Sequence, residues 1–197
     1  YMEIIIHRIN TVKKLNSIPS KYGTEIDVRS FKDKIILSHD PFNTGDLLSE
    51  YLENYHHGVL IVNIKEAGIE QIVLTMLKKF KIKNFFLLDV EFPFLYKSSR
   101  KGFKNTAIRF SEEESIDTVK KYVNYVNWVW IDTFTKFPIN QRNIKILDKF
   151  NKCLVSPDRW NRSKDIKPYR KIILKNKINI DYVMTSESNV KLWEDDL

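Results

Sequence analysis

The chain has 197 residues, of which 43% are hydrophobic and 29% are charged. These fractions are typical of a globular protein and exclude a disordered chain, a collagen and a coiled coil. Cysteine occurs once, at Cys153, which excludes an internal disulfide and a cluster of zinc-binding cysteines. The 33 lysine and arginine residues exceed the 25 aspartate and glutamate residues, and this excess favours an anionic partner: a phosphate ester, a nucleic acid or a membrane surface.

The sequence contains no repeat, linker or low-complexity tract. Its longest apolar runs are far shorter than the roughly 20 residues that a membrane span requires. The first residues lack the charged region and the cleavage site of a signal peptide. We therefore expect one soluble, cytoplasmic domain that covers residues 1–197.

Nine short apolar runs, rich in β-branched and aromatic residues, follow one another along the chain. They cover residues 3–6, 25–28, 35–37, 59–62, 85–88, 106–110, 128–131, 153–155 and 182–184. Continuous apolar runs of this length predict strands that are buried on both faces, as in a parallel sheet.

Amphipathic segments with helical spacing separate most of these runs. One apolar face extends from Ile69 through Ile72 and Leu77 to Phe80, and another from Ile144 to Phe150. Ser111 has the position of an N-cap, with Glu114 at the capping-box position. The alternation of strand and helix predicts a parallel α/β fold.

The run at residues 35–37 follows its predecessor after a turn at residues 32–34, which is too short for a crossover. We therefore expect it to form a β-hairpin with the second strand. Eight parallel strands remain, which predicts a compact (β/α)8 TIM barrel with a hairpin extension after strand 2. A doubly wound open sheet is the alternative, although the chain has no glycine-rich phosphate loop of either common kind.

Functional residues of such a barrel lie at the carboxyl ends of the strands. Glu25 and Asp27, two apart in the second strand, point the same way and repel each other unless a cation lies between them. Oxygen ligands favour one hard divalent cation, Mg²⁺ or Ca²⁺. The alternative is that Glu25 pairs with Arg29 or a lysine and that Asp27 faces solvent.

His7 and His39 follow the first strand and the hairpin strand. A single histidine at a strand end is more often a hydrogen-bonded structural residue than a catalyst. Two of them at neighbouring strand ends favour a general acid and a general base that act across a phosphodiester.

These elements occur in a recognisable order: His7-Arg8, then Glu25-Ile26-Asp27, a polar turn, and His39-Asp40. The series resembles the glycerophosphodiester phosphodiesterase family, which belongs to the phosphatidylinositol phospholipase C-like barrels. The resemblance is strong over residues 7–40 and partial over residues 60–65.

The resemblance implies a TIM barrel that binds one divalent cation and cleaves a small phosphodiester. It implies that Glu25 and Asp27 are metal ligands and that His7 and His39 are the acid/base pair. It further implies that Arg8 and Lys65 contact the phosphate.

The chain departs from the family pattern where an acid usually stands two residues before the lysine. Asn63 occupies that position, and its amide oxygen provides a metal ligand without charge. Asp89, after the next strand, is a candidate to compensate. Two functions therefore stay open: a metal-dependent phosphodiesterase, or a non-catalytic barrel that binds a phosphorylated ligand or partner.

Three further features bear on ligands and partners. Arg109 is a candidate to hold a second anionic group, or to pair with Glu112 or Asp132. Trp130 is a candidate to stack on the substrate, although packing is the commoner role of such a residue. The basic segment at residues 96–104, expected as a loop, is a candidate contact for an anionic membrane or a polyanion; only net charge favours a nucleic acid, so no specific nucleic-acid partner is expected.

Overall fold

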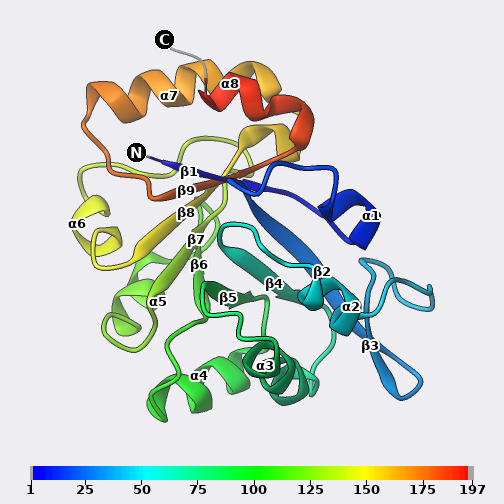
Figure 1. Cartoon of the computed structure of the whole chain (residues 1–197). Helices are drawn as coiled ribbons and strands as arrows, with labels where there is room; N and C mark the ends of the chain where they lie inside the picture. The colour runs from blue at the N-terminus through cyan, green and yellow to red at the C-terminus, as the bar shows by residue number, and fades with distance from the viewer. Residues whose placement is uncertain (1, 195–197) are drawn as a thin grey trace. The chain divides into compact units, whose positions relative to one another are not determined.

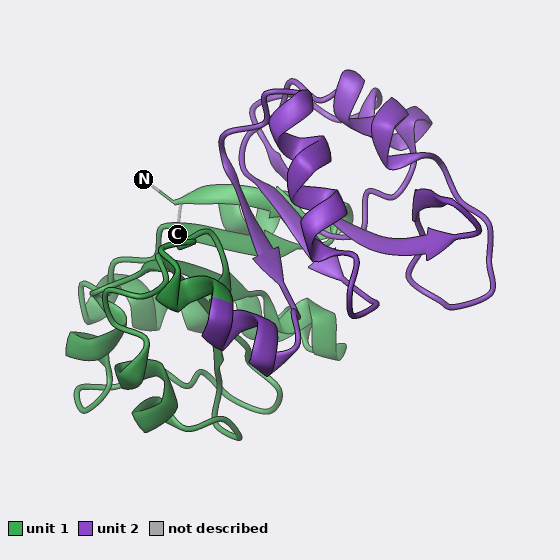
Figure 2. Cartoon of the chain, turned by 90° about the horizontal axis from the view of Figure 1, so that it is seen from below, with its two compact units in different colours: residues 1–6, 98–197 green, residues 7–97 purple. Residues whose placement is uncertain are grey.

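The computed structural model describes residues 2–194. The chain divides into two compact units, one made of residues 7–97 and the other of residues 98–197 with the first six residues (Figures 1 and 2). In both units strands alternate with helices, which confirms the predicted α/β class.

The unit of residues 7–97 contains three parallel strands and one antiparallel neighbour. The parallel strands are β2 (Gly23–Phe31), β4 (Leu60–Ile64) and β5 (Phe85–Leu88), in the order β2-β4-β5. Strand β3 (Lys34–Leu37) pairs antiparallel with β2, with Phe31 opposite Lys34, so the expected hairpin is confirmed. The helices of this unit are α1 (Val12–Leu15), α2 (Leu48–Glu53), α3 (Glu70–Lys79) and the start of α4 (Phe92–Arg100).

In the other unit five parallel strands pair in the order β1-β9-β8-β7-β6. They are β1 (Glu3–Ile6), β6 (Ala107–Phe110), β7 (Trp128–Ile131), β8 (Asn151–Val155) and β9 (Tyr182–Thr185). The helices between and after them are α5 (Ile116–Lys121), α6 (Ile144–Leu147), α7 (Ile166–Lys175) and α8 (Val190–Glu194), with short 3-10 turns at Pro157–Trp160, Ser163–Asp165 and Glu187–Asn189.

The strands are buried on both faces, as their uninterrupted apolar runs predict. Every residue of β4 and of β7 is buried. A polar residue follows each strand directly, and in β2 polar residues also occur inside the strand itself. Apolar side chains on one side of β2 pack in the core, and the side chains on the other side of β2 include carboxylates.

Helix α3 shows how the amphipathic pattern translates into packing. Its side chains Val73 and Leu77 are buried, and Lys78 and Lys79 are exposed. Ile72, which the sequence analysis placed on the buried face, is 54% exposed. It is one position before Val73, and the 100° rotation per residue carries it out of the contact with the sheet.

Two sequence predictions of local structure are wrong. Ser111 does not cap a helix: α5 begins at Ile116, and the Ser115 Oγ accepts from the Asp117 amide at 3.1 Å. The Ser111 Oγ instead accepts from the Glu113 amide at 3.1 Å inside a bend, in which Glu112 accepts a 2.8 Å hydrogen bond from the Thr135 hydroxyl.

The basic segment at residues 96–104 is also not a loop throughout. Its first five residues form the last part of α4, and only the residues after Arg100 are non-helical. Among residues 2–194, no helix is long and apolar enough to cross a membrane.

The two faces of α3 give a stability prediction. Leu77→Ala, at a side chain with no exposed area, should lower the free energy of unfolding by about 2–5 kcal/mol, because it removes buried methyl groups and leaves a cavity. Ile72→Ala on the same helix serves as the control and should change it by no more than about 0.5 kcal/mol. Urea unfolding followed by circular dichroism measures both, and equal losses would contradict the assigned faces.

Candidate active site

Strand β2 builds the candidate site, because it carries polar side chains on one side at every second residue. Glu25 and Asp27 lie on this side and are only 2% and 1% exposed. Ile26 and Val28 alternate with them and are fully buried in the core. The apolar residues hold the strand in place, and the two carboxylates are thereby fixed next to each other.

The parallel pairing of β2 with β4 brings a third polar side chain to the carboxylates. Asn63 is the register partner of Asp27, and its Nδ2 donates a hydrogen bond to Glu25 Oε1 at 3.0 Å. The amide thus lies beside both acids, as the sequence pattern of strand ends predicts.

The segment after β1 folds onto the same carboxylates. The Arg8 backbone amide donates to Glu25 Oε2 at 2.8 Å, and His7 Nε2 lies 3.8 Å from that oxygen. Arg8 has a φ of 56°, in the left-handed region that a residue with a side chain adopts only at a cost. The hydrogen bond to Glu25 offsets this cost and keeps His7 at the site.

Asn10 is a residue that the sequence analysis missed. Its Nδ2 donates to Asp27 Oδ2 at 2.8 Å, and its Oδ1 accepts from the Asp27 backbone amide at 2.8 Å. This reciprocal pair fixes the Asp27 carboxylate. The signal for it in the sequence is Asn10-Thr11 shortly after His7-Arg8, a weak match to the loop that follows His-Arg in the family that the sequence resembles.

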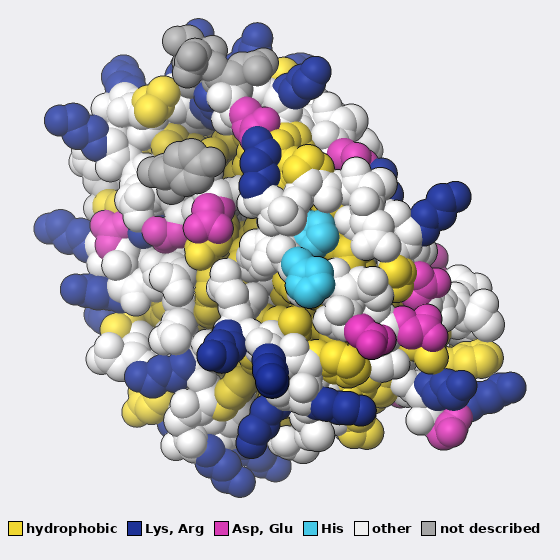
Figure 3. Space-filling view, viewed as in Figure 1, with side chains coloured by type: hydrophobic (Ala, Val, Ile, Leu, Met, Phe, Trp, Pro, Cys, Tyr) yellow, Lys and Arg dark blue, Asp and Glu magenta, His cyan; other side chains and the backbone are white. Residues whose placement is uncertain are grey.

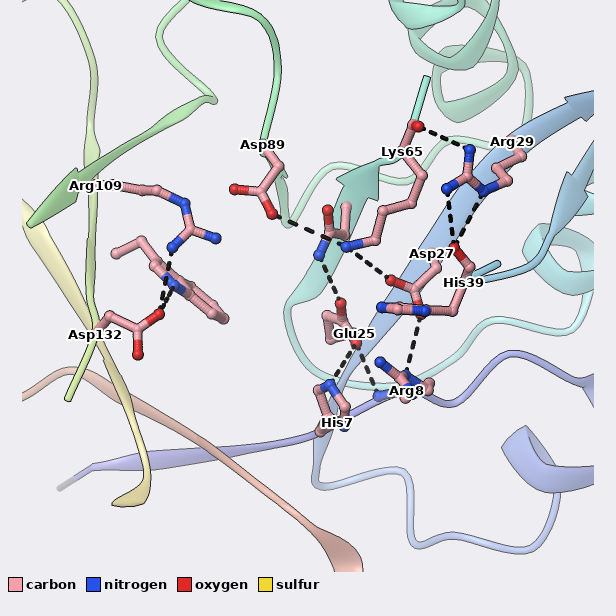
Figure 4. A network of polar contacts seen from close by, with 12 residues as sticks. His7, Arg8, Glu25, Asp27, Arg29, His39, Lys65, Asp89, Arg109 and Asp132 are labelled. Atoms are coloured by element: carbon pink, nitrogen blue, oxygen red, sulfur yellow. Dashed lines mark hydrogen bonds and ion pairs between the residues drawn. The ribbon is translucent and has the colours of Figure 1, made fainter. Parts of the chain in front are cut away.

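Basic side chains surround the oxygens of Asp27. Lys65 Nζ lies 3.3 Å from Asp27 Oδ1 and 4.0 Å from Asp89 Oδ2, and Arg8 Nε lies 3.6 Å from Asp27 Oδ2 (Figure 4). Asp89 follows β5 and also has a positive φ, 57°. The structure therefore gathers the expected phosphate-binding residues around the expected metal ligands.

His39 stands where β3 ends, and its ring is half-exposed. Its Nδ1 lies 2.7 Å from Asp40 Oδ1, and this hydrogen bond lowers the pKa of the Asp40 carboxyl. The Ser38 amide donates to the Asp27 carbonyl at 2.9 Å, so the backbone before His39 is tied to β2. Figure 4 draws the His39 ring on the same side of β2 as Asp27.

Arg29 holds the two loops that carry His39 and Lys65. Its Nε and Nη2 donate to the His39 carbonyl at 3.1 and 3.0 Å, and its Nη1 donates to the Lys65 carbonyl at 2.9 Å. Arg29 therefore does not pair with Glu25, which was one of the alternatives from the sequence. Its spacing, two residues after Asp27, places it on the same side of the strand and is the signal that marks it.

Burial and a neighbouring negative charge together raise the pKa of the Glu25 carboxyl. Loss of water, followed by the repulsion from Asp27, raises the pKa of Glu25 to about 7, although hydrogen bonds from Asn63 and from the Arg8 amide act in the opposite direction. A carboxylate pair of this kind gains stability from any cation that reaches it.

The donors at this place fit a divalent cation. Two buried oxygens, Asp27 Oδ1 and Asn63 Oδ1, make no hydrogen bond, and both are hard oxygen donors next to the Glu25 carboxylate. Within residues 2–194 no group of three histidine, cysteine, aspartate or glutamate residues is arranged to hold a metal. The oxygen donors gathered at this place are thus two carboxylates and one amide oxygen.

Arg109 and Trp130 lie in the other unit and meet at a different carboxylate. Arg109 Nη1 and Trp130 Nε1 both lie 3.3 Å from Asp132 Oδ2. Trp160 Nε1 donates to Asp132 Oδ1 at 2.7 Å. The pairing of Arg109 with Asp132 was one of the expected alternatives, and Trp130 is buried; a substrate contact by either residue stays a prediction.

No family model and no curated protein matches the chain. Two solved structures, both from Agrobacterium tumefaciens strain C58, are similar to it. The first is a glycerophosphodiester phosphodiesterase, 15% identical, with 96% of this chain and 99% of that chain covered and a TM-score of 0.64. The second is a candidate glycerophosphoryl diester phosphodiesterase, 11% identical, with 97% and 96% covered and a TM-score of 0.69.

This likeness defines the class of the fold. The chain has the α/β fold of the glycerophosphodiester phosphodiesterases, the TIM barrel that the strand pattern predicts, with β3 as the hairpin extension. The fold class and the resemblance are thus confirmed, in preference to a doubly wound open sheet. That residues 1–197 are a single domain stays a prediction.

The raised pKa of Glu25 predicts how stability depends on pH in the absence of metal. Because the folded protein holds this proton up to about pH 7 and the unfolded chain releases it near its ordinary pKa, the free energy of unfolding should fall as the pH rises from about 4.5 to 7. Glu25→Gln should abolish the decrease in the free energy of unfolding that the titration of Glu25 causes. This variant should therefore be more stable than wild type at neutral pH.

Urea unfolding in the presence of a chelator, at several pH values across this range, measures the effect. Glu66→Gln is the control, since hydrogen bonds from Ser30 lower the pKa of this carboxyl. A wild-type profile that coincides with that of Glu25→Gln would contradict the assignment.

Proposed function

We propose that this protein is a metal-dependent phosphodiesterase that hydrolyses a glycerophosphodiester or a related small phosphodiester. The observation that carries the proposal is the convergence of His7, Glu25, Asp27 and Lys65 within one unit, at distances of 3.3–3.8 Å between the charged groups. The fold that the chain shares with glycerophosphodiester phosphodiesterases supports the same reaction.

Glu25, Asp27 and Asn63 are the residues that would hold the cation, with Asp89 as a further acid nearby. A divalent cation bound by these residues would offset the negative charge that develops on the phosphate oxygens. The two buried oxygens without hydrogen bonds, Asp27 Oδ1 and Asn63 Oδ1, support this assignment.

The basic residues of the site bind and orient the phosphodiester. Lys65 and Arg8 are held in place by their ion pairs with Asp27. Because their positions are fixed before the substrate binds, little free energy is lost in arranging them around a bound phosphate. A guanidinium can hold two phosphate oxygens at once, whereas the ammonium of Lys65 acts as a point charge.

The two histidines exchange protons with the substrate. One takes the proton of the nucleophile, which is water or a neighbouring hydroxyl of the substrate, and the other gives a proton to the leaving oxygen. The hydrogen bond between His39 Nδ1 and Asp40 orients the ring and leaves Nε2 for proton transfer. Glu25 Oε2 lies 3.8 Å from His7 Nε2, so the carboxylate and this ring stand side by side at the site.

A non-catalytic barrel that binds a phosphorylated ligand is the second candidate, and one observation favours it. The Asn63 amide nitrogen already neutralises part of the Glu25 charge, while Lys65 does the same for Asp27. A site balanced in this way holds a cation less tightly than a site with three carboxylates.

The histidine assignment predicts a loss of turnover. His7→Ala and His39→Ala should each lower kcat for glycerophosphocholine or bis(4-nitrophenyl) phosphate by roughly 10²–10⁴-fold, since each removes one proton-transfer group. The exposed His56, outside the site, provides the matched control, and His56→Ala should turn over like wild type. Full turnover by either site variant would refute the assignment.

The assignment of Asn63 as a metal ligand predicts that an added charge at this position increases the affinity for a divalent cation. Asn63→Asp should bind Ca²⁺ or Mg²⁺ about tenfold more tightly than wild type, because a charged oxygen replaces a neutral one. Isothermal titration calorimetry measures the affinity, and Asn84→Asp, at an exposed residue just before β5, is the control. Unchanged affinity would remove Asn63 from the ligand set, and hydrolysis that appears only in Asn63→Asp would establish the non-catalytic alternative for the natural chain.

A further inference from the structure

Helix α7 carries a concentration of positive charge that the proposed reaction does not use. Four of its ten residues are basic and none is acidic. Lys167, Lys171 and Lys175 recur every four residues, so they lie along one face, and all three are exposed. Figure 3 shows separate Lys and Arg side chains along the top edge of the view, where α7 lies. Arg170 turns away from this face, since its Nη1 donates to the Leu192 carbonyl at 2.7 Å.

An apolar side chain lies among these lysines. Leu174 is 64% exposed, three residues after Lys171 and seven after Lys167, which places it on the same face. The helix packs through the opposite side, where Ile166 and Tyr169 are buried. The Leu174 side chain therefore contributes little to the core.

The surroundings of the helix add to the positive charge. Lys164 and Lys177, just before and after α7, are both exposed. Asp165, the acid at the start of the helix, is paired with Arg162 at 2.6 Å. The charge of the lysines is therefore not offset from within their own helix.

We propose that the α7 lysine face, defined as Lys167, Lys171, Leu174 and Lys175, docks onto an anionic lipid surface. The lysines match the negative charge of lipid headgroups, to which basic residues near a membrane surface are attracted. Leu174 enters the interfacial layer, as the apolar residues of an amphipathic surface helix do. A nucleic acid offers the same charge but no apolar layer for Leu174, so the lipid surface fits both features.

Binding of the full chain to vesicles tests the proposal. Wild type should sediment with vesicles of equal parts phosphatidylcholine and phosphatidylserine, and not with phosphatidylcholine alone, and salt should weaken the binding. The triple variant Lys167→Gln, Lys171→Gln, Lys175→Gln should bind about 100-fold more weakly, since each lysine contributes roughly fivefold. Leu174→Ser should bind about fivefold more weakly, because it removes the apolar contact.

A second triple variant with the same change of net charge is the control. Lys78→Gln, Lys79→Gln and Lys83→Gln replace exposed lysines on and after α3, and this variant should bind like wild type. Circular dichroism checks that all variants are folded. The proposal fails if wild type does not sediment with the anionic vesicles, or if both triple variants lose binding equally. It also fails if the protein binds duplex DNA but no vesicles, which would assign the face to a polyanion.

Discussion

The repulsion between two buried carboxylates on one strand governs the arrangement of the candidate site. Glu25 and Asp27 are fixed by the core on the other side of β2, so they cannot move apart. The Arg8 amide, the Asn10 and Asn63 side chains and the Lys65 ammonium all point at them and lower their electrostatic cost. The segment after β1 is held in its strained turn for the same reason, and His7 is thereby brought to the site.

The bounds of three strands, β1, β5 and β7, equal the expected ones. Strand β4, expected at residues 59–62, extends to Ile64, because the polar Asn63 lies within the strand and does not end it. Helix α5 was placed too early because Ser111 and Ser115 offer the same capping chemistry, and in the structure Ser111 lies in a bend where a hydrogen bond tethers Glu112 to Thr135. Such a tether joins residues far apart in sequence, so local patterns do not reveal it.

In the candidate site, too, some residues were predicted from local sequence patterns and others were found only in the folded structure. Alternation along β2 was enough to place Glu25 and Asp27 together, and strand ends were enough to place Lys65 near them. The role of Asn10 depends on the backbone turn at Arg8, and the role of Asp132 depends on three donors from separate segments. The pairing of Arg109 with Asp132 was among the alternatives from the sequence, whereas the contacts of Asn10 and of Trp160 join segments that no local pattern brings together.

The hydrogen bonds of Arg29 restrict how the site can change by substitution. One guanidinium holds the carbonyls that follow two different strands, so the loop of His39 and the loop of Lys65 share a single anchor. A substitution that shifts one loop also displaces the other. The His39 ring and the Lys65 ammonium are therefore coupled in position, and a change in the place of one requires either a matching change in the other or the replacement of Arg29.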